Sequence, residues 1–204
     1  MKSIKELRSD CGQFKLPIRI LQKFSRDYKL LDVGAGEHLL EDFLPKNIMY
    51  FSLDYIGEQN FKFDLNLNTP IRDSMFDIII CLETLEHTLY PHRVMTELLR
   101  IAKPNALFIL SMPNEYNFWC RLKFLFGSKS FVQETFQTTE KHLHIHNPRV
   151  KDIRRFFSQY IKIEAIDYPW YSHHQWIVCD KIINFFAKIW PSMFARSVVV
   201  AGRS

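Results

Sequence analysis

Residues 76–82, FDIIICL, restrict the fold more than any other part of the sequence. The run is apolar without alternation, and this pattern indicates a strand buried on both faces, as in a parallel sheet. Neighbouring parallel strands need long crossover connections, which are usually helices. The sequence therefore predicts a sheet with helices on both faces, a three-layer α/β/α fold.

The flanking segments continue this alternation. We expect strands at residues 30–33, 49–54, 61–64, 106–112, 160–167 and 197–201, and helices at 17–27, 38–44, 91–102 and 148–158. Together they predict one domain over residues 1–204, built on a doubly wound, Rossmann-like sheet. Residues 114–147 do not fit the alternation and are expected to form an insertion over the carboxyl edge of the sheet. Residues 168–190 form a second, amphipathic segment.

The composition is that of an ordinary globular protein. The 27 basic and 22 acidic residues give a mild net charge of +5. The one local excess, at Arg149, Lys151, Arg154 and Arg155, is interpreted as a solvated helix face and not as a nucleic-acid site. The cysteines at positions 11, 81, 120 and 179 form no CxxC pair, which favours reduced thiols and a cytoplasmic location. The N-terminus has no apolar signal core, and no uncharged apolar run approaches the ~20 residues of a membrane-spanning helix.

Glycines and acids lie where the expected strands end, and open α/β sheets bind their ligands at that edge. Asp32-Val33-Gly34-Ala35-Gly36 follows the first strand, Asp54 ends the second and Asp64 ends the third. Glycines let a ligand approach the backbone closely. A carboxylate such as Asp54 can accept both hydrogen bonds of a ribose diol, and Asp64 can accept one from an adenine amino group.

NAD is the rival ligand for such a site. Its fingerprint needs a third glycine where this chain has Leu39, and Glu37 would repel a pyrophosphate. S-adenosylmethionine (SAM) carries no phosphate and has a cationic sulfonium and an amino group. The acidic turn therefore favours SAM.

Three blocks of the sequence resemble class I SAM-dependent methyltransferases, in their small-molecule branch (methyltransferase type 11/23-like). The blocks are residues 30–36 (LLDVGAG), residues 76–87 (FDIII through LEH) and residues 98–113 (LLRIAKPNALFILSMP). The resemblance implies a seven-stranded, mostly parallel sheet with an antiparallel last strand. The residues that it implies at the cofactor are Asp32, Gly34, Ala35 and Gly36 around the methionine part, Asp54 at the ribose, Asp64 with Leu65 at the adenine, and Cys81, Leu82 and Glu83 on the floor.

Two positions depart from that family pattern. His38 stands where the family often has a third small residue, and it leaves the packing of the first turn open. Asn105 replaces a usual glycine, which is expected to be harmless because Asn tolerates a left-handed backbone.

His87 is the candidate general base, because an imidazole of near-neutral pKa can take a proton from an attacking hydroxyl. The alternative is a structural histidine, since methyl transfer can run on positioning alone. Glu83 and Glu86 are spaced too closely for the paired-glutamate loop of arginine methyltransferases, so Glu86 is interpreted as a structural acid. Cys81 lacks the preceding proline of nucleophilic cysteines in RNA methyltransferases, so no covalent role is expected.

His142, His144 and His146 alternate and would share one face of a strand. With no nearby cysteine or Glu-x-x-His pattern, the strip is interpreted as a packing or substrate-contacting surface, and no metal site is predicted. Residues 176–190 can form one apolar helix stripe, which would pack on the core or a second subunit, or contact a membrane surface. The oligomeric state stays open.

We therefore expect methyl transfer from SAM to a small-molecule or lipid- or glycan-linked acceptor, most simply an O-methylation that leaves S-adenosylhomocysteine. The acceptor would lie under residues 114–147 and 168–190. Nucleic acid is not the expected acceptor, because Asn147-Pro148 is followed by Arg149 instead of a second proline. The alternative function is a non-catalytic subunit with a SAM-binding fold that regulates a partner enzyme.

Overall fold

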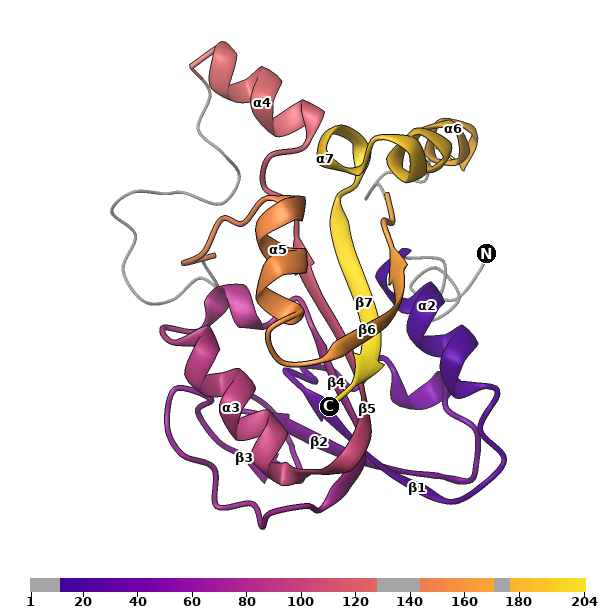
Figure 1. Ribbon diagram of the computed structural model, residues 1–204, viewed down its shortest axis with the longest axis vertical. Helices are drawn as coiled ribbons and strands as arrows, with labels where there is room; N and C mark the ends of the chain where they lie inside the picture. The colour runs from indigo at the N-terminus through magenta and orange to yellow at the C-terminus, as the bar shows by residue number, and fades with distance from the viewer. Residues whose placement is uncertain (1–11, 128–143, 171–176) are drawn as a thin grey trace.

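A seven-stranded sheet forms the centre of the computed structural model, which describes residues 12–127, 144–170 and 177–204 (Figure 1). The strands are β1 (Tyr28–Val33), β2 (Ile48–Asp54), β3 (Phe61–Lys62), β4 (Phe76–Leu82), β5 (Ala102–Pro113), β6 (Lys162–Asp167) and β7 (Ser197–Arg203). Their order across the sheet is β3-β2-β1-β4-β5-β7-β6, and β7 runs antiparallel to both of its neighbours. The predicted Rossmann-like sheet with an antiparallel last strand is confirmed.

The helices are α2 (Gly12–Leu21), α3 (Pro91–Ile101), α4 (Phe118–Leu125), α5 (Val150–Phe157), α6 (Ile177–Ile189) and α7 (Pro191–Phe194), with 3-10 helices at Glu41–Phe43 and Leu85–His87. In Figure 1, α3 and α5 lie on one face of the sheet and α2 lies on the other. Alternate residues of β4 supply both cores: Ile79 packs with the α3 and α5 side, and Ile78 with the α2 side. The unbroken apolar run of β4 thus reflects burial on both faces.

The helix expected at residues 38–44 is the main error in the fold prediction. The chain makes consecutive turns after Gly36, and only Glu41–Phe43 is helical, as a 3-10 helix. His38 has a left-handed backbone with φ of 56°, whereas a right-handed helix needs φ near −63°. A helix therefore cannot pass through His38.

Other helices and strands begin or end at residues that differ from the expected ones, for local reasons. The first described helix covers Gly12–Leu21 instead of residues 17–27, with Pro17 inside it. Strand β3 ends at Lys62 because Asp64 forms its own turn, in which its carboxylate accepts hydrogen bonds from both the backbone and the side chain of Asn66. Asn105 has φ of 62°, which confirms the left-handed conformation expected where the family has glycine.

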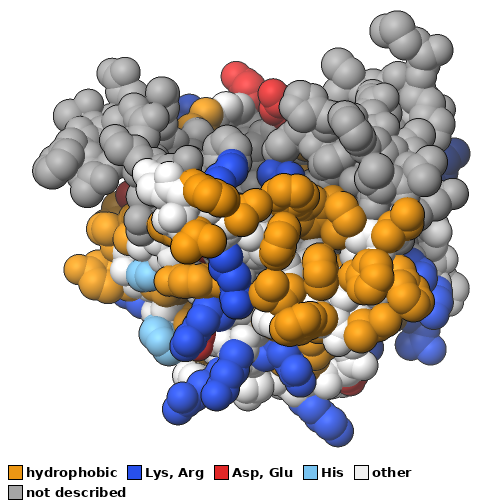
Figure 2. All heavy atoms as spheres, turned by 90° about the horizontal axis from the view of Figure 1, so that it is seen from above, with side chains coloured by type: hydrophobic (Ala, Val, Ile, Leu, Met, Phe, Trp, Pro, Cys, Tyr) orange, Lys and Arg blue, Asp and Glu red, His pale blue; other side chains and the backbone are white. Residues whose placement is uncertain are grey.

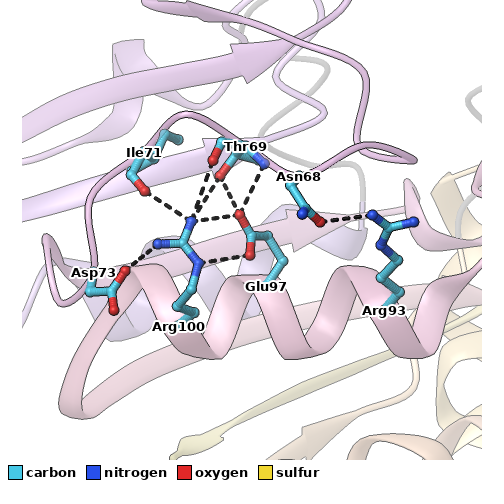
Figure 3. A network of polar contacts seen from close by, with 7 residues as sticks. All are labelled: Asn68, Thr69, Ile71, Asp73, Arg93, Glu97 and Arg100. Atoms are coloured by element: carbon cyan, nitrogen blue, oxygen red, sulfur yellow. Dashed lines mark hydrogen bonds and ion pairs between the residues drawn. The ribbon is translucent and has the colours of Figure 1, made fainter.

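A polar network fastens the loop before β4 to α3 (Figure 3). Arg100 donates to both carboxylate oxygens of Glu97, at 2.8 and 2.6 Å, and to the carbonyl of Ile71 at 2.9 Å. Glu97 also accepts from the backbone N–H and the hydroxyl of Thr69, and Arg100 pairs with Asp73. The hydrogen bonds from Arg100 lower the pKa of Glu97 to about 2.

Candidate functional site

Asp32, the second-last residue of β1, is a buried carboxylate, 7% exposed. It is hydrogen-bonded by the phenol of Tyr50, at 2.9 Å between the two oxygens. Burial is the largest influence on its pKa and raises it to about 6, although the Tyr50 hydrogen bond and the nearby His38 act in the opposite direction. A buried carboxylate that accepts a hydrogen bond from Tyr50 can still accept others from a cationic group.

The two glycines of the first turn have different surroundings. Gly34 has φ of 73°, and a Cβ built there would lie 2.2 Å from the hydroxyl of Thr84. Gly36 has φ of 52°, but a Cβ built there would meet no atom within 4 Å. Gly34 is thus required by packing between the β1 and β4 ends, whereas Gly36 borders open space that a ligand can occupy.

Asp54, at the end of β2, joins the two strand ends. One of its carboxylate oxygens accepts from the N–H of Gly36 at 3.0 Å, and the other accepts from the N–H groups of Tyr55 at 2.7 Å and Ile56 at 3.2 Å. His38 and Gln59 add a second link at 2.9 Å, and Gln59 also donates to the carbonyl of Gly36. His38 is therefore accommodated in the first turn by a polar contact with Gln59 in the β2–β3 loop.

A pocket of about 270 Å³ opens beside this turn. Its wall consists of the first-turn residues, the start of α2 and the end of β4: Gln13, Phe14, Asp32, Gly34, Ala35, Gly36, Glu37, Leu39, Leu40 and Leu82. Five of the residues expected at a cofactor line one cavity, namely Asp32, Gly34, Ala35, Gly36 and Leu82.

Glu83 follows directly after β4. Its backbone is left-handed, with φ of 50°, and its N–H donates to the hydroxyl of Ser111 on β5 at 3.0 Å. Asp64 and Leu65 lie beyond β3 and outside the lining of the pocket, with Asp64 exposed and Leu65 half-buried. Cys81 is fully buried, and burial raises the pKa of its thiol, which suits a packing role.

A second group of titratable side chains lies after β4. His87 and His144 pack edge to face with their ring centroids 4.7 Å apart. His144 Nδ1 lies 2.7 Å from a carboxylate oxygen of Glu115, a buried residue. Glu86 is fully buried, and burial together with the carboxylates of Glu83 and Glu115 raises its pKa well above the ordinary value.

Sequence reasoning missed several of these contacts. Tyr50 was detectable, because Leu30 pairs with Tyr50 and Asp32 with Ser52 in the β1–β2 register, so Tyr50 and Asp32 share a face. Thr84 and Glu115 gave no local signal, since their partners are distant in sequence. Of the three alternating histidines expected to share one face, His146 is hydrogen-bonded to the carbonyl of Thr88 at 2.9 Å, whereas His142 lies outside the described residues.

An exposed aromatic surface lies at the end of the molecule where α4, α6 and α7 gather (Figures 1 and 2). Figure 2 looks down on this end and shows hydrophobic side chains with Lys and Arg among and around them. Rings of Phe118, Phe186 and Trp190 contact Phe194, which joins α4, α6 and α7. The exposed members of this aromatic surface are Phe118, Trp119, Phe124, Leu125, Phe126, Ile182, Phe185, Phe186, Ile189 and Trp190. Within the described part of the chain, every helix is too short or too polar to cross a membrane.

Solved structures with the same fold include a SAM-dependent methyltransferase from Archaeoglobus fulgidus, with a TM-score of 0.58, 13% identity, and coverage of 98% of this chain and 94% of that chain. One from Mesorhizobium loti gives a TM-score of 0.62 at 11% identity over 96% and 99% of the two chains. A third is a Haloferax volcanii complex of the Trm112 methyltransferase activator with a methyltransferase, at 0.55 and 15% identity over 98% and 92%. At these identities the likeness shows a shared fold.

Among curated proteins, the uncharacterized protein MJ0638 of Methanocaldococcus jannaschii is 29% identical in an alignment of 108 positions that covers 47% of this chain. The match spans about half of that relative, 46% of its length. Residues 6–161 match the sequence model of a methyltransferase domain family. This match covers most of the chain and agrees with the strand order and the glycine turn, so the protein belongs to the methyltransferase domain family.

Proposed function

We propose that this protein transfers a methyl group from SAM to an oxygen of a small-molecule or lipid- or glycan-linked acceptor. The observation that carries the proposal is the pairing of Gly36 with Asp32 at one pocket. Gly36 leaves open space at a left-handed position, and Asp32 offers a buried carboxylate beside it. Such a pocket suits a ligand that carries positive charge and comes close to the backbone.

The proposal assigns each part of SAM to residues at the ends of the first four strands, of which Asp32, Gly34, Ala35, Gly36 and Leu82 line the pocket. Asp32 would accept from its amino group, with Gly34, Ala35 and Gly36 around the methionine chain. Asp54 would hold the ribose, Asp64 and Leu65 would meet the adenine, and Leu82 and Glu83 would form the floor. SAM supplies a methyl group activated by its sulfonium, so the protein's main contribution is to align the acceptor oxygen.

A hydroxyl acceptor has to lose its proton during methyl transfer. His87 and the groups around it are the candidates for accepting this proton. The 3-10 helix that contains His87 follows β4, at the same carboxyl edge of the sheet as the pocket. At this edge lie α4, from the expected insertion at residues 114–147, and α6, from the segment at residues 168–190. We propose that both bound the acceptor within the single domain of residues 1–204.

The aromatic surface favours an acceptor with a lipid part. It lies beyond the carboxyl end of β5, because α4 follows that strand, so it faces the same edge as the pocket. Exposed aromatic and aliphatic side chains next to Arg121 and Lys188 suit an interfacial contact with anionic lipid. The free thiols of the described cysteines, Cys81 and Cys120, agree with action on the cytoplasmic side of such a membrane.

Calorimetric titration tests the cofactor part of the proposal. We expect micromolar binding of SAM and S-adenosylhomocysteine, no binding of NAD, and at least tenfold weaker SAM binding by Asp54→Ala. Asp27→Asn is the matched control, because Asp27 is exposed and precedes β1 at the opposite edge. No binding of SAM by the folded protein would contradict the proposal.

Sedimentation with vesicles tests the lipid part. We expect the protein to sediment with vesicles that contain phosphatidylglycerol, and the double variant Phe185→Ser, Trp190→Ser to stay in solution. Leu67→Ser is the control, because Leu67 is an equally exposed apolar residue in the loop after β3. Equal sedimentation of all three proteins would remove the lipid argument and leave a free small molecule as the acceptor.

The alternative is a SAM-binding-fold subunit that regulates a partner. The Haloferax volcanii structure supports this alternative, because it is a complex between a methyltransferase and an activator protein. SAM binding without turnover on any acceptor, together with stable co-purification of one enzyme, would favour this alternative.

A further inference from the structure

Glu86 is a buried carboxylic acid in the 3-10 helix after β4. The residue is fully inaccessible to solvent, and neither oxygen of its carboxyl group has a hydrogen-bond partner among the described residues. A buried polar group without a partner costs free energy, and such groups in folded proteins call for a compensating ligand or ion.

His87 and His144 lie close enough to Glu86 to bind the same ion. One potential ligand atom each from Glu86, His87 and His144 lies within 4.8 Å of the others. Ligand atoms around a divalent ion at about 2.1 Å are no more than ~4.2 Å apart, so side-chain shifts of well under 1 Å would close the set. The group therefore has the dimensions of a metal site in its metal-free form.

Backbone hydrogen bonds hold the two halves of this group together. The carbonyl of Glu86 accepts from the N–H groups of Ile145, at 2.8 Å, and His146, at 3.1 Å. His146 also binds the carbonyl of Thr88 through its ring at 2.9 Å. Residues separated by nearly sixty positions are thus fixed side by side, which reduces the ordering cost of binding an ion.

Glu115 orients the second histidine. Its carboxylate lies 2.7 Å from His144 Nδ1, so Nε2 is the nitrogen of His144 that is available to a metal. Metal-binding histidines usually donate their other ring N–H to a carboxylate, which fixes the ring and raises the basicity of the bound nitrogen. The Glu115–His144 pair has this arrangement.

We propose that Glu86, His87 and His144 bind one divalent metal ion, with Glu115 as the carboxylate that positions His144. Two imidazole nitrogens and one carboxylate oxygen favour a first-row transition ion such as Mn²⁺, Co²⁺ or Zn²⁺ over Mg²⁺, which prefers oxygen ligands. Three protein ligands leave coordination positions for water or for an acceptor oxygen.

The part of this site in catalysis rests on the proposed function. An acceptor hydroxyl on the ion would lose its proton to solvent more easily, because a bound cation stabilises the oxyanion. The oxygen then forms a bond to the methyl carbon as the carbon–sulfur bond breaks, and the products are the methyl ether and S-adenosylhomocysteine. His87 would then serve as a ligand, and the ion would supply the activation otherwise expected of a general base.

The test is metal binding by the chelator-treated full chain, which needs no acceptor. Titration calorimetry with Mn²⁺, Zn²⁺ and Mg²⁺, and the visible absorption of Co²⁺, would report the site. We expect one transition ion per chain, weaker Mg²⁺ binding, and a loss of affinity of more than tenfold in both Glu86→Gln and His144→Gln. Glu115→Gln should weaken binding about 10- to 100-fold.

His92→Gln is the control, because His92 is exposed and contacts Tyr160 on another part of the surface. Circular dichroism would confirm that Glu86→Gln folds, as expected for a neutral side chain of the same shape. Absence of transition-metal binding, or binding that survives both ligand variants, would overturn the proposal. SAM titration of the same metal-free protein separates the two proposals, since loss of one binding activity leaves the other measurable.

Discussion

Tyr50 donates a hydrogen bond to Asp32 at 2.9 Å, across the junction of β2 and β1. This contact opposes the effect of burial on the pKa of Asp32, which still lies at about 6 instead of 3.8. The fold thus keeps a carboxylate at the pocket that is costly to ionise, and this arrangement makes both stability and cofactor affinity depend on pH.

Asp32→Asn should stabilise the fold and weaken cofactor binding. Because the folded-state pKa is raised, ionised Asp32 destabilises the protein: the cost is absent below pH 4, grows between pH 4 and 6, and is complete above pH 6. We expect the variant to gain about 3 kcal/mol in unfolding free energy at pH 8 and nothing at pH 3.5. Urea unfolding at the two pH values measures this, and a gain that is the same at both would contradict the assignment.

Tyr50→Phe should raise the pKa of Asp32 further, because the hydrogen bond that favours the carboxylate is lost. SAM binding to the ionised form should then weaken more at pH 6.5 than at pH 8. Calorimetry at both pH values gives the ratio, with Tyr90→Phe as a control at an exposed tyrosine. A uniform loss of affinity at both pH values would show that Tyr50 acts by packing alone.

The two glycines of the turn should respond differently to alanine. Gly34→Ala places a methyl group against Thr84 at a left-handed position, so we expect a loss of stability of about 2 to 4 kcal/mol. Gly36→Ala meets only the backbone penalty of about 1 kcal/mol, but its methyl group enters the space assigned to SAM. Thermal unfolding and SAM titration of both variants separate the effects, and adding Thr84→Gly should partly restore Gly34→Ala.

Glu97→Gln should weaken the link between the β3–β4 loop and α3 (Figure 3). The lowered pKa of Glu97, about 2 against 4.5, means that its carboxylate stabilises the fold fully above pH 5 and loses this effect as pH falls towards 2. We expect a loss of about 2 kcal/mol at pH 7 that shrinks as the solution is acidified. Denaturation from pH 7 to pH 3 would follow it, and a constant difference would argue against an ionic origin.

The sequence predicted the parts of this protein that depend on local pattern. Strand β4, the acid at each of the first two strand ends and the glycine turn were all expected, because hydrophobic runs and turn residues determine them. The irregular turns after Gly36 were not expected, since His38 combines a left-handed backbone with a contact to Gln59 on another loop, which no local pattern reveals. The grouping of His144 with His87 was equally hidden, because fifty-seven positions separate them and only tertiary hydrogen bonds bring them together.

The turns that replace a helix after Gly36 also affect which ligands the pocket rejects. A helix beginning there would point its partial positive charge and free N–H groups at the ligand, as nucleotide-binding folds do for phosphate. Here residues 37–40 form turns, and the acids in this stretch and the 3-10 helix after it are Glu37, Glu41 and Asp42. The first turn therefore lacks the helix N-terminus that would attract the phosphates of ATP or NAD, so we expect both compounds to compete poorly with SAM for the proposed site.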